Sequence, residues 1–256
     1  MQIVFALVAL VVGFVLLVKG ADWFVEGSAG IANKFGIPQI VIGLTIVAMG
    51  TSMPEAAVSI SAALRGSAEI TIGNVVGSNI MNILVILGLT AVVCQIAVQK
   101  TTIHYEIPMV IGVTILLAVM GLQNNIISRA EGVILLACMV VYMLYLLRLA
   151  KRGVVENEEM DAYAKQVSFG RLILLVVVAI IFGSHVAVEA ASAIARIFGI
   201  SERFIGLTIV AFGTSLPELV TSVAAARRGN SDIAVGNIVG SNLFNIMFVV
   251  GITAVI

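Results

Sequence analysis

Two glutamates lie inside segments that are otherwise apolar enough to cross a membrane. Glu55 belongs to GLTIVAMGTSMPEAAVSI, from Gly43 to Ile60, and Glu218 ends GLTIVAFGTSLPE, which begins at Gly206. An unpaired charge at the centre of a bilayer costs about 2.5–3.5 kcal/mol on insertion scales. No Lys or Arg lies in the two apolar segments that carry the glutamates, or in the segment that follows each of them, to offset that cost. We therefore expect both carboxylates to have a functional role.

A proline stands directly before each glutamate, at Pro54 and Pro217. Proline has no N–H for the helical bond to the carbonyl four residues earlier, and its ring clashes with that carbonyl, so both helices are predicted to break or kink here. Non-helical backbone at membrane depth is tolerated only where it is buried in protein or lines a cavity. The backbone carbonyls expected to become available as ligands lie near Ala48, Gly50, Ala211 and Gly213.

A polar stripe follows each break. Its members, spaced i, i+4 and i+8, are Asn74, Ser78 and Asn82 in one segment and Asn237, Ser241 and Asn245 in another. This spacing places each set of three on one face of a helix. Interhelical hydrogen bonding is the alternative role for such side chains, and a single hydroxyl fits that role as well as it fits a cation ligand.

Together these groups form a set of oxygen ligands. The hydroxyls in it belong to Thr51, Ser52, Ser78, Thr214, Ser215 and Ser241. Carboxylate, hydroxyl, amide and carbonyl oxygens suit Ca²⁺, Na⁺ or Mg²⁺ rather than zinc or copper. Two carboxylates balance the charge of one Ca²⁺ or of two Na⁺, so either load would restore neutrality in a medium of low dielectric constant.

The elements that position these residues are membrane-spanning helices. Hydrophobic residues make up 61% of the chain and charged residues 11%, where a soluble domain has about 25% charged residues. Long unbroken apolar runs indicate helices, because a membrane barrel would show short alternating strands. The chain is therefore predicted to be an all-α polytopic membrane protein, with the lipid bilayer as its partner and no nucleic-acid partner. Its eight apolar segments lie near residues 3–26, 40–64, 70–93, 104–122, 130–148, 170–195, 204–226 and 233–256.

The chain contains an internal repeat. Gly206 lies 163 positions after Gly43, and the motif IGNVVGSNIMNIL returns at the same offset as VGNIVGSNLFNIM. Five apolar segments separate the starts of the two copies, and an odd number turns the second copy upside down. This is the inverted-topology repeat of secondary transporters, which places equivalent residues around a pseudo-two-fold axis in the membrane plane. Glu55 and Glu218 are predicted to meet near the midplane.

Domain boundaries follow from the repeat. We expect a first repeat of five helices over 1–148, a linker over 149–169 and an inverted second repeat over 170–256. Ile256 aligns with Val93, whereas the first copy continues through two more apolar segments. The second copy is therefore expected to be truncated, with eight of ten helices present, and a complete protein of eight helices is the alternative.

The basic residues are distributed unevenly between the two membrane faces. If the spans alternate in direction, four of the basic residues lie on one side of the membrane. Nine lie on the other side, which is also the side of the linker. The positive-inside rule makes the side with nine cytoplasmic. We therefore expect a multi-pass protein of the cell membrane with its N-terminus outside. Glu26 and Glu189 are repeat-related and fall near the ends of their spans, where packing, lining or interfacial roles are expected rather than coordination.

GTSMPE and GTSLPE, each followed by a GSN motif, closely resemble the two alpha-repeats of the sodium/calcium exchanger family of prokaryotic-type membrane antiporters. The resemblance implies ten helices in two inverted halves and exchange of Na⁺ for Ca²⁺. Its implied metal ligands are Ala48, Thr51, Ser52, Glu55, Ser78 and Asn82 in the first copy, and Ala211, Thr214, Ser215, Glu218, Ser241 and Asn245 in the second. Some members carry Asp at the position of Asn245, including members of the potassium-dependent branch, which weakens the case for K⁺ co-transport.

The leading functional prediction is therefore a secondary active antiporter. In it, Na⁺ and Ca²⁺ compete for one site near the midplane, and alternating access carries them across the membrane. A Ca²⁺/H⁺ antiporter is the nearest alternative, and an ion channel is a more distant one. An enzyme is not expected, because Ser52 and Ser215 have no His or Lys base at repeat-equivalent positions. No cofactor is expected either, since Ca²⁺ and Na⁺ are the transported substrates, and the sequence points to no protein partner.

Overall fold

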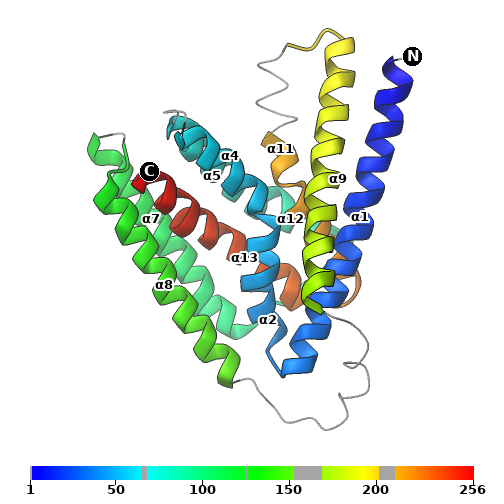
Figure 1. The fold of residues 1–256 in the computed structure, drawn as a ribbon. Helices are drawn as coiled ribbons and strands as arrows, with labels where there is room; N and C mark the ends of the chain where they lie inside the picture. The colour runs from blue at the N-terminus through cyan, green and yellow to red at the C-terminus, as the bar shows by residue number, and fades with distance from the viewer. Residues whose placement is uncertain (1, 65–67, 125, 153–168, 202–210) are drawn as a thin grey trace.

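The computed structural model describes residues 2–64, 68–124, 126–152, 169–201 and 211–256 (Figure 1). These residues form helices and connecting turns, and no strand occurs among them. The predicted all-helical polytopic architecture is confirmed. Most of the predicted linker lies outside the described residues, as does the start of the span expected near 204–226.

Six described helices are long and apolar enough to cross a membrane, and a seventh span is formed by a bent pair. The six spans are Ile3–Phe35, Thr71–Val93, Thr102–Leu122, Arg129–Lys151, Val177–Ile197 and Ser231–Val255. The helices that make them are α1 (Gln2–Phe35), α5 (Ala68–Met81) continued by η2 (Asn82–Ile86) and α6 (Leu87–Val93), η3 (Thr102–Glu106) with α7 (Ile107–Asn124), α8 (Arg129–Arg152), α9 (Phe169–Ile197), and α13 (Ser231–Phe244) continued by η6 (Asn245–Val250) and α14 (Gly251–Val255).

The bent pair carries the first GTSMPE motif. It comprises α2 (Gln39–Ile42), η1 (Gly43–Val47) and α3 (Ala48–Thr51), followed by α4 (Met53–Leu64) at an angle of 48°. Ser52 separates the two parts, with φ −83° and ψ 7°. In the second copy, Ser215 separates α11 (Ala211–Thr214) from α12 (Leu216–Arg227) with nearly the same backbone angles, φ −89° and ψ 3°. The predicted breaks are confirmed, and both lie two residues before the proline.

The η segments are π-helical turns, and two of them begin at the predicted ligands Asn82 and Asn245. Such turns are rare inside α-helices and occur frequently at functional sites. Because a π-turn adds one residue to the helical repeat, it changes the direction of the side chains that follow. The polar stripes predicted from regular helical spacing therefore end at these asparagines.

Helices α1 and α9 lie side by side along one side of the molecule, while α7 and α8 lie on the opposite side (Figure 1). The backbones of α1 and α9 approach closely at Gly13 and Gly183. A Cβ added at Gly13 would lie 2.6 Å from the nitrogen of Ala187, and one added at Gly183 would lie 2.7 Å from the nitrogen of Leu17. These small residues allow the two helices to pack as one closely joined pair.

Helix α13 runs through the centre of the molecule (Figure 1). The span Ser231–Val255, which it begins, is the most buried of the six spans of the described residues. Helix α13 packs against η1, where a Cβ added at Gly236 would lie 2.9 Å from the Cα of Gly43. Gly236 therefore allows the backbones of α13 and η1 to pack closely. In the first copy, Gly73 and Gly77 meet nothing within 4 Å among the described residues. The repeat equivalent of η1, residues 206–210, lies outside the described residues.

Candidate cation site

The two helix breaks place each glutamate beside a serine of the other repeat. Oγ of Ser52 donates a hydrogen bond of 2.7 Å to Oε1 of Glu218, and Oγ of Ser215 donates one of 3.2 Å to Oε1 of Glu55. Both carboxylates are buried, with at most 1% of the residue exposed. The site is therefore built across the interface between the two repeats, with equivalent contacts in both directions.

Ser78 of α5 joins the first carboxylate to the second break. Its hydroxyl donates to Oε1 of Glu55 at 3.0 Å and lies 2.9 Å from the hydroxyl of Ser215. Its repeat equivalent, Ser241 of α13, lies 3.4 Å from the carbonyl of Ala48. Each of these serines therefore lies beside the broken helix of the other repeat.

Four buried oxygens have no hydrogen-bond partner among the described residues near this interface. They are Oε2 of Glu55, Oε2 of Glu218, Oδ1 of Asn82 and Oδ1 of Asn245. Each repeat supplies one carboxylate and one amide oxygen, as a pseudo-two-fold arrangement requires. A buried polar atom without a partner costs about 1–3 kcal/mol, and more if it is charged. A bound cation would remove that cost, because all four atoms are acceptors.

The Ala48 carbonyl differs from the prediction. It accepts the backbone N–H of Ser52 at 3.0 Å, so the helix break does not free it. The break begins only at Ser52, and the helical bond that ends there is still formed. The same carbonyl also lies 3.3 Å from the hydroxyl of Thr51 and 3.4 Å from that of Ser241, so it already has further polar partners. Ala211 begins α11, and its side chain lies outside the described residues.

Thr51 and Thr214 are the threonines of the two motifs, and each lies directly before a helix break. The hydroxyl of Thr51 lies 3.1 Å from the carbonyl of Val47 and 3.0 Å from Oδ1 of Asn237. A hydroxyl has one proton, so Thr51 donates to one of these acceptors at a time and keeps its lone pairs for a cation. Thr214 is half-buried beside the second break.

The first asparagine of each predicted stripe bonds to the backbone that carries the glutamate of its own repeat. Nδ2 of Asn74 donates to Oγ of Ser59 at 2.9 Å and to the backbone carbonyl of Glu55 at 3.2 Å. Asn237 repeats this pattern with Ser222 at 2.9 Å and the carbonyl of Glu218 at 3.3 Å. These amides hold the backbone that carries each carboxylate. The two serines were missed in the sequence, although each follows its glutamate by four residues and so shares its helix face.

Asn79 and Asn242 were also missed as members of the site. They are the asparagines of the two GSN motifs, and each bonds to an asparagine ligand predicted in the other repeat: Nδ2 of Asn82 donates to Oδ1 of Asn242 at 2.9 Å, and Nδ2 of Asn245 donates to Oδ1 of Asn79 at 3.1 Å. The sequence signal that could have identified them is that Asn242 repeats Asn79 at the offset of 163 positions. The partner of each could not be predicted from the spacing within one helix.

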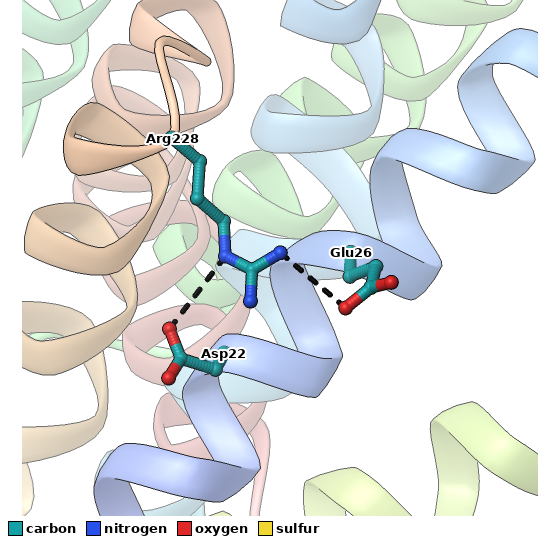
Figure 2. Close-up of polar contacts among 3 residues, drawn as sticks. All are labelled: Asp22, Glu26 and Arg228. Carbon is teal, nitrogen blue, oxygen red and sulfur yellow. Dashed lines mark hydrogen bonds and ion pairs between the residues drawn. The ribbon is translucent and has the colours of Figure 1, made fainter.

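Other acidic residues lie away from this interface. Arg228, which follows α12, bridges Asp22 and Glu26 of α1 at 3.6 and 3.3 Å (Figure 2). Glu26 therefore makes an ion pair between α1 and the residue that follows α12, which fits the packing role expected for it. Glu106 is a buried carboxylate that the sequence analysis did not single out, and it accepts a hydrogen bond from the hydroxyl of Tyr145.

The family model for the sodium/calcium exchanger protein matches residues 5–148 and 169–256. The chain is 38% identical to the inner membrane protein YrbG of Escherichia coli, over 96% of this chain and 78% of YrbG. It is 33% identical to the sodium/calcium exchanger MaX1 of Methanosarcina acetivorans, over 95% of this chain and 81% of MaX1. Its fold matches the sodium-calcium exchanger NCX_Mj with a TM-score of 0.86 and 34% identity, over 99% of this chain and 83% of NCX_Mj. The inverted arrangement of two similar halves, the buried oxygen cluster between them and these matches agree, and the chain belongs to the sodium/calcium exchanger family.

Proposed function

We propose that this chain is a secondary active antiporter that exchanges Na⁺ for Ca²⁺ at the interface between its repeats. The observation that carries the proposal is the set of four unpartnered buried oxygens on Glu55, Glu218, Asn82 and Asn245. Ca²⁺ takes six to eight oxygen ligands. The hydroxyls of Ser52 and Ser215 lie within hydrogen-bond distance of Glu218 and Glu55 and would supply further ligands, as would the Ala48 carbonyl. Na⁺ prefers the same kind of ligand, so both ions would compete for the two negative charges.

The proposed transport cycle uses alternating access. The close pairing of α1 and α9 through Gly13 and Gly183 makes these helices a candidate moving unit, while α13 and the two broken helices form the fixed site. Movement of the pair would open the site to one side of the membrane at a time. The excess of basic residues on one face supports an outward N-terminus and a cytoplasmic linker.

Transport by the purified protein in liposomes tests the proposal. The vesicles are loaded with Na⁺, diluted into Na⁺-free medium containing radioactive Ca²⁺, and compared with vesicles that carry only a pH gradient. Uptake driven by the outward Na⁺ gradient is expected, and Glu55→Gln should abolish it. Uptake that follows the pH gradient and is indifferent to Na⁺ would replace the proposal with Ca²⁺/H⁺ exchange.

A further inference from the structure

The side chain of Asn79 bonds at both of its ends. Its Nδ2 donates to the backbone carbonyl of Asn242 at 3.2 Å, and its Oδ1 accepts a hydrogen bond from Nδ2 of Asn245 at 3.1 Å. Asn79 lies on α5, whereas its two partners lie at the end of α13 and the start of η6. The contacts therefore cross from the first repeat to the second.

The backbone carbonyl fixes the direction of this chain of hydrogen bonds. A carbonyl can only accept, so Asn79 must present its NH₂ group to Asn242. The other end of the Asn79 amide is then its oxygen, which can also only accept. Asn245 must therefore present its own NH₂ group to Asn79. As a result, Oδ1 of Asn245 is turned away from Asn79, and it is one of the four buried oxygens without a partner among the described residues.

The orientation of this amide matters for cation binding. An asparagine amide rotated by half a turn would exchange its oxygen and its NH₂ group, and an NH₂ group repels a cation that the oxygen attracts. We propose that Asn79 is a positioning residue for the cation site, which holds the amide of Asn245 with its oxygen toward the ion. This inference rests on the proposed function, because it takes Asn245 as a ligand.

The other half of the molecule carries a matching contact. Nδ2 of Asn82 donates to Oδ1 of Asn242 at 2.9 Å, and Oδ1 of Asn82 is likewise buried and without a partner among the described residues. Asn242 is the repeat equivalent of Asn79. The asparagine of each GSN motif therefore bonds to the asparagine ligand proposed in the opposite repeat. The same contacts join α5 to α13, so they also align the two halves across the site.

A double-mutant experiment separates orientation from packing. Asn79→Leu keeps the approximate volume and removes both hydrogen bonds, and equilibrium dialysis of radioactive Ca²⁺ against the purified protein gives its affinity. We expect binding to weaken about tenfold, since a buried polar group left without its partner costs roughly one power of ten in an equilibrium constant. Asn245→Asp places oxygens at both ends of the side chain, so orientation no longer matters. In that background Asn79→Leu should cause less than about a twofold loss.

A purely structural role for Asn79 would give the same loss in both backgrounds and would overturn the inference, as would wild-type affinity in Asn79→Leu alone. Asn33→Leu on the exposed end of α1 is the matched control and should bind Ca²⁺ normally. If Asn79→Leu does not fold, the mirror pair Asn242→Leu and Asn82→Asp decides the question by the same comparison. Ca²⁺ binding is measured without any gradient, so the result stands even if Na⁺ proves not to be the coupling ion.

Discussion

Ser52 in the first repeat donates a hydrogen bond of 2.7 Å to Glu218 in the second, and the two residues are 166 positions apart in the chain. The reciprocal bond joins Ser215 to Glu55. The residue at each helix break therefore stabilises the carboxylate that the other break presents. Each carboxylate therefore has a partner from the other repeat only when the two halves are packed together, and the proposed cation site depends on that packing.

Replacing either carboxylate removes half of the negative charge of the site. We expect Glu55→Gln or Glu218→Gln to reduce Ca²⁺ transport in liposomes by at least about a hundredfold, because loss of one partner of a buried charge pair costs about 3 kcal/mol or more. Ser61→Ala, on α4 six residues beyond Glu55, is the control and should transport normally. Normal exchange by either glutamine variant would contradict the placement of the site.

Removing the hydroxyl of Ser52 should weaken binding through Glu218. Ser52→Ala is expected to lower Ca²⁺ affinity about tenfold, because a hydrogen bond to a charged group contributes about 1.5–3 kcal/mol. In the Glu218→Gln background the same change should have a smaller effect. Calorimetric titration with Ca²⁺ measures the affinity in both backgrounds. Equal losses of affinity would show that the 2.7 Å bond between Ser52 and Glu218 does not contribute to Ca²⁺ binding.

The contact between α13 and η1 has no room for a side chain at Gly236. Gly236→Ala would place a Cβ 2.9 Å from the Cα of Gly43, and backbone atoms on both sides limit any adjustment. We expect a loss of stability of about 1–3 kcal/mol, seen as a lower thermal unfolding temperature in detergent. Gly112→Ala on α7 is the matched control, since its Cβ would meet nothing within 4 Å among the described residues. Equal unfolding temperatures for the two variants would argue against the close approach.

Restraining α1 should stop transport without preventing binding. Asp22 and Arg228 lie on α1 and on the turn after α12, and they form an ion pair at 3.6 Å (Figure 2). In a protein whose own Cys94 and Cys138 are replaced, Asp22→Cys with Arg228→Cys can be joined by a cleavable reagent that links two thiols. The linked protein is expected to bind Ca²⁺ but not to exchange it, and reduction of the link should restore exchange. Unchanged exchange by the linked protein would contradict movement of α1 against the site.

Several features of the site could be predicted from the sequence because they are local. Pro54 and Pro217 predict helix breaks from the chemistry of one residue, and the structure confirms both breaks. The offset between the two copies predicts which residues are equivalent and that the copies are inverted. The cost of a charge in a membrane marks Glu55 and Glu218 without knowledge of any contact.

The partners of each residue were decided only by the tertiary structure. The sequence offers the asparagines of the GSN motifs as repeated residues, but Asn79 meets Asn245 only because α5 and η6 cross at that point. The Ala48 carbonyl was expected to be free, yet it accepts the backbone N–H of Ser52. Pro54 removes only its own N–H, whose helical acceptor would be Gly50, so the bond to Ala48 is unaffected. Residue type and spacing therefore determined which groups could hold a cation, since these are properties of single helices. Packing between helices determined which of these oxygens remain without partners, since that depends on how the two inverted copies meet.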